Sequence, residues 1–179
     1  AVTMCDVHRA TLTHITPEVV PPALGIAERD ALTGRELLVA LAAGCEVTTR
    51  IGLGLDFPEF RKRGWHGPGI IGPFGAAAAV GRLRGFEPET MARAFGLAGS
   101  QAAGTFAAWG TPTVKWHQCR AALSGLMAAL LAEQGFDTRA EHPGHFGLVG
   151  MQERATKADA RLSVLSGTGG TSIALEWGD

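Results

Sequence analysis

The sequence predicts a mainly α-helical chain. Apolar residues recur at helical spacing, helix start and stop residues bracket these stretches, and no alternating strand pattern of useful length occurs before about residue 171. With 179 residues, 46% of them hydrophobic, the chain can bury a core of its own. No repeat or low-complexity linker divides it, so residues 1–179 are expected to belong to one helical domain.

The N-terminal part is expected to hold two helices behind an irregular start at residues 1–16. A helix is predicted from Pro17, because apolar residues follow at helical spacing and proline is tolerated in a first turn. The next helix starts with a capping box, in which the Thr33 hydroxyl and the Glu36 carboxylate satisfy backbone N–H groups reciprocally. Residues 56–63 are predicted to be a short connection.

Three further helices are predicted in the rest of the chain. One covers residues 74–83 behind a glycine-rich turn, and the next opens with Pro88 in its first turn. The strongest pattern covers residues 117–134, with apolar residues at i, i+3, i+4, i+7 and i+8. We also expect a more polar helix over residues 151–165 and an extended stretch over 167–179.

Charge and cysteine content exclude several classes of protein. A formal net charge of −1 gives no reason to expect nucleic acid or an anionic membrane as a partner. No apolar run reaches the ~18 residues that a membrane-spanning helix needs. The odd, widely spaced Cys5, Cys45 and Cys119 fit free thiols in a reducing, cytoplasmic compartment. Cys119 is expected to be a small core residue.

Residues 67–72 match the pattern G-x-G-x-x-G, but we do not interpret them as a nucleotide site. That fingerprint requires a preceding buried strand, and Phe60-Arg61-Lys62-Arg63-Gly64 is not one. Pro68 also removes an amide that could contact phosphate. Metal and cofactor are not expected either, because the six histidines show no HxxxH or HExxH pattern and no cysteine pairing at finger spacing. His142 and His145 are expected to be solvated.

A set of titratable residues in turns or at helix starts could carry acid–base chemistry near neutral pH. Each is more often structural when taken alone, but here small residues flank them and none lies on an amphipathic helix face. His66 is the most notable, because it sits in a glycine-rich turn that leads into a helix of small residues. The set comprises Asp6, His8, His14, His66, Lys115 and His117.

These residues and their contexts resemble the MmgE/PrpD family, which includes 2-methylcitrate dehydratase, cis-aconitate decarboxylase and iminodisuccinate epimerase. Residues 6–14 (DVHRATLTH) resemble an early D-T-H-R-x-S-x-x-H stretch, and residues 64–66 its G-W-H motif. Residues 99–104 (GSQAAG) and 115–126 (KWHQCRAALSGL) resemble G-S-Q-A-x-G and K-x-x-x-x-R-A-A-x-S-G. The resemblance is strongest over residues 1–140.

The resemblance implies part of an all-helical domain whose second, α+β lid domain is missing from this chain, and a homodimer formed through the helical part. It implies His66 as general acid or base, His14 as a second catalytic histidine, and Asp6 as a group that orients an imidazole or binds a hydroxyl. It also implies substrate-binding roles, for Lys115, which would hold a carboxylate, and for His117 and His8. The family's later lysine and histidine have no counterpart here.

The function implied is a cofactor-independent lyase of the 2-methylcitrate dehydratase type. It would remove a proton beside a carboxylate of a small di- or tricarboxylate, which needs a positioned base, an acid and cations. Alternatives are a cis-aconitate-type decarboxylase and an iminodisuccinate-type epimerase. A non-catalytic helical dimerisation module is another, because the lid domain is missing and because Val7 and Cys5 stand where the family frequently has a threonine and an acid.

Overall fold

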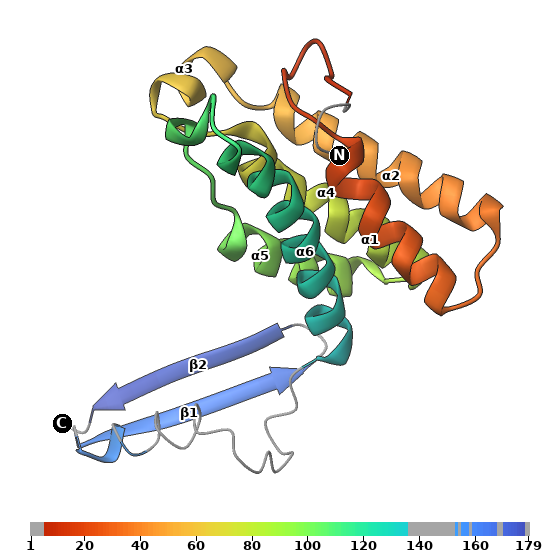
Figure 1. The fold of residues 1–179 in the computed structure, drawn as a ribbon. Helices are drawn as coiled ribbons and strands as arrows, with labels where there is room; N and C mark the ends of the chain where they lie inside the picture. Colours follow the sequence, from red (N-terminus) through yellow and green to blue (C-terminus); the bar gives the residue numbers. More distant parts are fainter. Residues whose placement is uncertain (1–5, 136–152, 154, 158, 168–169, 178–179) are drawn as a thin grey trace. The chain divides into compact units, whose positions relative to one another are not determined.

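The computed structural model describes residues 6–135, 153, 155–157, 159–167 and 170–177 and divides the chain into two compact units, Ala1–Gln134 and Gly135–Asp179 (Figure 1). The first unit is helical, which confirms the predicted fold class. Its elements are α1 (Thr16–Arg29), α2 (Gly34–Leu53), α3 (Phe57–Lys62), α4 (Gly67–Leu83), α5 (Pro88–Gln101), the 3-10 turn η1 (Phe106–Ala108) and α6 (Thr113–Gln134).

Local sequence signals set several helix starts. The capping box at α2 is confirmed, since the Glu36 backbone N–H donates to Thr33 Oγ1 (3.3 Å) and the Thr33 backbone N–H donates to Glu36 Oε2 (2.7 Å). Pro88 is the first residue of α5, as predicted. Pro17 lies in the first turn of α1, where backbone N–H groups have no intrahelical partner, so a proline there costs no hydrogen bond.

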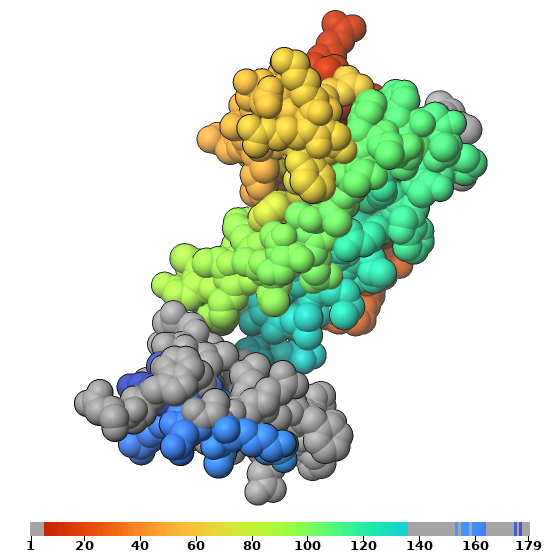
Figure 2. All heavy atoms as spheres, turned by 90° about the vertical axis from the view of Figure 1, so that its left-hand side faces the viewer, coloured from red at the N-terminus to blue at the C-terminus, as the bar shows by residue number. Residues whose placement is uncertain are grey.

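Helix α4 is the centre of the helical unit and contacts α1, α2, α5 and α6. Figure 2 shows α5 in green and α6 in teal along one face of this unit, with α3 in yellow beside them. The prediction that α4 begins at residue 74 was wrong, because it begins at Gly67. Each glycine is less favourable in a helix than alanine by about 1 kcal/mol, so the sequence pattern does not indicate this glycine-rich first part. In the folded protein, its small residues allow close packing against four helices, which stabilises the helical conformation.

Helix α6 packs against α4 mainly through small residues, and the half-buried Leu126 and Leu130 pack beside them on a cluster that includes Val80 of α4. It begins at Thr113, four residues before the predicted start. The larger apolar residues Leu123, Met127 and Leu131 are 55%, 44% and 45% exposed. The buried face consists of His117 and Gln118 near the start of the helix and then of Ala121, Ala122, Ser124, Gly125, Ala128, Ala129 and Ala132. None of the helices within the described residues, α6 included, is both long and apolar enough to cross a bilayer.

The contact between α4 and α6 gives a first testable prediction. A Cβ on Gly125 would lie 2.4 Å from the Pro73 carbonyl oxygen and 2.4 Å from Ala76 Cβ. Gly125→Ala is therefore expected to lower the free energy of unfolding by about 2 kcal/mol, although alanine is the better helix former. Gly96→Ala is the matched control, because nothing lies within 4 Å of its added Cβ, and it should stabilise by about 0.5–1 kcal/mol. Urea unfolding of both variants measures the difference, and equal effects would contradict the packing argument.

In the second unit, β1 (Ala160–Gly167) and β2 (Gly170–Trp177) pair antiparallel from Ala160↔Trp177 to Gly167↔Gly170. The extended stretch over 167–179 is confirmed in its described residues, 167 and 170–177, but the predicted helix over 151–165 is wrong from residue 160 onward. The partner strand supplies the ladder hydrogen bonds, so pairing decides the structure of residues 160–165.

The prediction that Cys119 is a core residue was also wrong, because its side chain is exposed. It precedes Leu123 by four residues, so it shares the outward face of α6. His142 and His145 lie outside the described residues.

Candidate active site

A left-handed turn at Gly64 brings His66 to the start of α4. Gly64 has φ +81°, a conformation in which a side chain would be strained. Its carbonyl oxygen accepts the Phe106 backbone N–H at 2.6 Å, and the His66 backbone N–H donates to the Gly104 carbonyl oxygen at 3.0 Å. These bonds hold residues 64–66 against residues 104–106, which come from a distant part of the sequence.

The glycines after His66 serve close packing rather than phosphate binding. The Ala103 backbone N–H donates to the Gly69 carbonyl oxygen at 3.0 Å, and a Cβ on Gly69 would lie 2.3 Å from the Ala103 carbonyl oxygen. A Cβ on Gly104 would lie 3.3 Å from His117 Nδ1. Small residues on both segments therefore let the start of α4, the 103–106 segment and α6 meet at one point.

At that point two buried histidines form a hydrogen-bonded pair. His66 Nδ1 and His117 Nδ1 are 2.9 Å apart, and the side chains are 5% and 9% exposed. A hydrogen bond between two Nδ1 atoms requires one ring to carry the proton there and the other to lack it. With both rings neutral, the donor has a free lone pair on Nε2 and the acceptor carries a proton on Nε2. The pair therefore offers one basic nitrogen and one N–H hydrogen-bond donor.

The electrostatic surroundings keep this pair neutral. Burial is the main cause that lowers the pKa of His66 to about 4, and the neighbouring basic groups of His117, His14, Arg61 and Lys115 lower it further. Burial also lowers the pKa of His117, assisted by Arg120. A histidine in this environment is an unprotonated base at neutral pH.

The lowered pKa of His66 predicts how stability depends on pH. Because the folded pKa of about 4 lies below the ordinary 6.5, the unfolded chain binds the proton first. The stabilisation is complete above pH 6.5 and is lost as the pH falls toward 4. The ordinary and folded pKa values of His66 differ by about 2.5, which corresponds to about 3 kcal/mol in the free energy of unfolding. Urea unfolding between pH 7.5 and 4.5 should show a smaller loss for His66→Gln than for the wild type, and equal losses would contradict it.

A cavity of about 250 Å³ adjoins the pair and is the candidate active site. It brings together two imidazoles and one ammonium group, from the segment before α1, the start of α4 and the first turns of α6. Its lining consists of His14, His66, Trp109, Gly110, Val114, Lys115 and Gln118. Of the residues predicted from the sequence, His14, His66 and Lys115 line it, and His117 contacts it through His66.

Asp6 holds His14 in place through its backbone. The Asp6 carbonyl oxygen lies 2.6 Å from His14 Nδ1, and because a carbonyl only accepts, His14 donates a hydrogen bond to it from Nδ1. The Asp6 carboxylate accepts the Thr16 backbone N–H at 3.1 Å and the Thr16 hydroxyl at 2.5 Å. Asp6 thus orients an imidazole and anchors the start of α1, but it does not line the cavity.

His8 occupies a different place from the other predicted residues. Its Nδ1 lies 2.9 Å from Thr11 Oγ1 within a local turn, where the His8 backbone N–H also donates to the Thr13 carbonyl oxygen. It is not among the residues that line the cavity. The structure therefore gives no contact that supports a substrate-binding role for His8.

The sequence interpretation missed an aromatic wall beside His66. The Trp109 ring meets His66 edge-on at 6.2 Å and stacks on Phe106 at 5.0 Å, and the Arg61 guanidinium lies over Phe106 at 4.5 Å. Phe106 and Trp109 follow no periodic pattern in the sequence, so helical spacing did not indicate them. Gln118, which also lines the cavity, lies inside a quoted motif and was not assigned a role.

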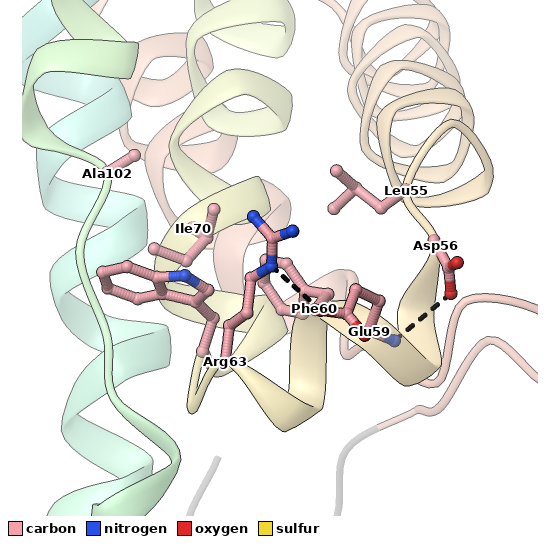
Figure 3. Close-up of a pocket in the computed structure, with 8 residues that line it drawn as sticks. Leu55, Asp56, Glu59, Phe60, Arg63, Ile70 and Ala102 are labelled. Carbon is pink, nitrogen blue, oxygen red and sulfur yellow. Dashed lines mark hydrogen bonds and ion pairs between the residues drawn. The ribbon is translucent and has the colours of Figure 1, made fainter.

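A larger pocket of about 450 Å³ lies elsewhere, along α3 (Figure 3). Its charged groups already have partners, since Arg63 Nε pairs with Glu59 Oε1 at 3.2 Å and Asp56 Oδ1 accepts the Glu59 backbone N–H at 3.2 Å. No histidine or lysine lines it. The smaller cavity is the better candidate because acid–base groups converge there. In the described part of the chain, no group of three His, Cys, Asp or Glu residues is arranged to hold a metal.

Comparison with known proteins gives consistent matches. A family model described as the MmgE/PrpD N-terminal domain matches residues 2–143. A cis-aconitate decarboxylase-like protein of Aspergillus oryzae is 35% identical over 144 residues, which cover 76% of this chain and 30% of that protein. The cis-aconitate decarboxylases of Aspergillus terreus and Homo sapiens are 30% and 31% identical, over 74% and 69% of this chain and 28% and 26% of their own lengths. The chain thus spans less than a third of these relatives.

Proposed function

The chain belongs to the MmgE/PrpD family, and from that premise we propose that it forms the helical part of the active site of a cofactor-independent lyase. The observation that carries the proposal is the buried His66–His117 pair, with His14 and Lys115 around the same cavity. This arrangement supplies a neutral base in His66, a second imidazole in His14 and a cation in Lys115, the kinds of group that proton transfer beside a carboxylate requires. The substrate class is a small di- or tricarboxylate, in keeping with a cavity of about 250 Å³.

In the proposed mechanism, the Nδ1–H of His66 donates a hydrogen bond to His117 Nδ1. The lone pair on His66 Nε2 is then the base. The Lys115 ammonium holds a substrate carboxylate, and His14 contributes a second nitrogen through Nε2. His117 acts through His66, and Asp6 acts through His14, so both are positioning residues. A dry site strengthens each of these interactions, because the effective dielectric falls on burial.

Two lyase reactions fit these groups. In decarboxylation, the C–C bond to a carboxylate breaks, CO2 leaves, and the carbon left with the electron pair takes a proton from the protein. In dehydration, a base removes a C–H proton, the electron pair forms a double bond, and the hydroxyl leaves as water with a proton from an acid. The names of the relatives support decarboxylation of cis-aconitate, and the motif resemblance supports dehydration of 2-methylcitrate.

The full-length protein that contains this domain should be tested on both compounds. Release of CO2 from cis-aconitate indicates the decarboxylase, and formation of a conjugated double bond from 2-methylcitrate indicates the dehydratase. Exchange of substrate hydrogen for solvent deuterium without either loss indicates an epimerase. Absence of turnover and of carboxylate binding contradicts the proposal and supports the non-catalytic module.

The homodimer predicted from the family resemblance stays a prediction. The exposed residues Leu123, Met127 and Leu131 form an apolar stripe on α6 that a contact with a second copy would cover.

A further inference from the structure

Gln118 is a buried polar residue of the cavity that the proposed mechanism does not use. It lies on α6 one turn after Lys115, its side chain is 2% exposed, and it lines the cavity with His66 and His14. Its Oε1 is buried and accepts no hydrogen bond from the described residues. Buried acceptors almost always have a partner, and one without a partner costs the full desolvation penalty of the group.

Because Gln118 lines the cavity, rotation of its terminal amide can present Oε1 to a group bound there. Oε1 is an acceptor, so its partner must be a hydrogen-bond donor such as a hydroxyl. A carboxylate is an unfavourable neighbour for Oε1, because the oxygens of a carboxylate only accept hydrogen bonds. Lys115, on the same helix and lining the same cavity, provides the complementary donor for a carboxylate. The lining thus offers different polar groups for two parts of one ligand, a carboxylate and a hydroxyl.

We propose that Gln118 is a specificity-determining residue whose side-chain oxygen accepts a hydrogen bond from the hydroxyl of a small hydroxycarboxylate. This assignment rests on the proposed function of the cavity and sharpens its substrate class. A site built to hydrogen-bond a hydroxyl discriminates against the analogue that lacks it, because the buried acceptor is then left unpaired. Among the two lyase reactions, a bound hydroxyl is the leaving group of dehydration.

Citrate and propane-1,2,3-tricarboxylate test this assignment, because they differ only by the hydroxyl. Binding of both to the full-length protein is measured for the wild type and for Gln118→Met, which keeps the length of the side chain and removes the amide. The wild type is expected to prefer citrate by about tenfold. Gln118→Met should lose most of that preference through weaker citrate binding, with the affinity for the hydroxyl-free compound unchanged within about twofold.

The circular dichroism spectrum of the variant must match that of the wild type, so that a loss of both ligands reports on binding and not on folding. If Gln118→Met binds citrate with the wild-type preference, or loses both ligands equally, the assignment of Gln118 is overturned. If the wild type binds both compounds without preference, that assignment alone fails. If the wild type binds neither compound, the proposed function fails and the assignment of Gln118 fails with it.

Discussion

The variant His66→Gln is expected to lower kcat of the full-length protein by about 10²–10⁴-fold, the usual contribution of a positioned general acid or base. Glutamine is uncharged and similar in size, and its amide can still hydrogen-bond His117 Nδ1, which lies 2.9 Å from the His66 ring. What it lacks is a nitrogen that takes up a proton. The loss should therefore appear in kcat with little change in KM, measured with whichever of cis-aconitate or 2-methylcitrate is turned over.

The same exchange at His8 is the matched comparison. His8 hydrogen-bonds Thr11 and does not line the cavity, so His8→Gln should keep kcat within about twofold of the wild type. Retention of turnover in His66→Gln would remove His66 from the mechanism. An equal loss in both variants would show that the early segment around His8 reaches the substrate, as the motif resemblance implies.

Lys115→Met is expected to raise KM by about 10- to 100-fold. A hydrogen bond to a charged group contributes about 1.5–3 kcal/mol, and each 1.4 kcal/mol is a factor of ten in binding. Methionine retains the apolar stem of lysine, which lines the cavity with Val114, but loses the ammonium group. Steady-state kinetics on the full-length protein separate this effect from that of His66→Gln, because the chemical step retains its base.

Lys62→Met controls for the loss of one positive charge from the whole protein. Its side chain is 78% exposed and its ammonium lies 3.9 Å from Glu59, an ion pair of a kind that contributes little. KM should therefore stay within about twofold. An unchanged KM in Lys115→Met, or equal increases in both lysine variants, would contradict the role of Lys115 in carboxylate binding.

The helix starts that rest on short-range hydrogen bonds could be predicted from the sequence. Thr33 and Glu36 satisfy each other's backbone groups within four residues, and Pro88 needs no partner outside its own turn. The start of α4 could not be predicted in this way. Its glycine-rich first turns are poor helix formers, and contacts with α6 and the 103–106 segment decide their conformation.

The side of a helix that packs against the core also depends on the tertiary structure. Leu123, Met127 and Leu131 follow a regular helical spacing, and the pattern identifies the helix correctly. The pattern does not say which side the core lies on when the neighbouring helix is built from glycine and alanine. Close approach to α4 requires small residues in the contact, so Leu123, Met127 and Leu131 face outward and Cys119 faces outward with them, whereas Leu126 and Leu130 pack at the edge of the core.

By itself, the sequence determined a helical domain, its family and the residue types that could move a proton, because short motifs and helical spacing are local properties of the chain. The tertiary structure alone decided that His66 meets His117 across 51 positions, with His14 and Lys115 lining the cavity beside them, and that Asp6 acts through its backbone. It also decided the pKa of His66 and the burial of Gln118. These properties depend on burial and on contacts between distant segments, which spacing along the chain does not encode.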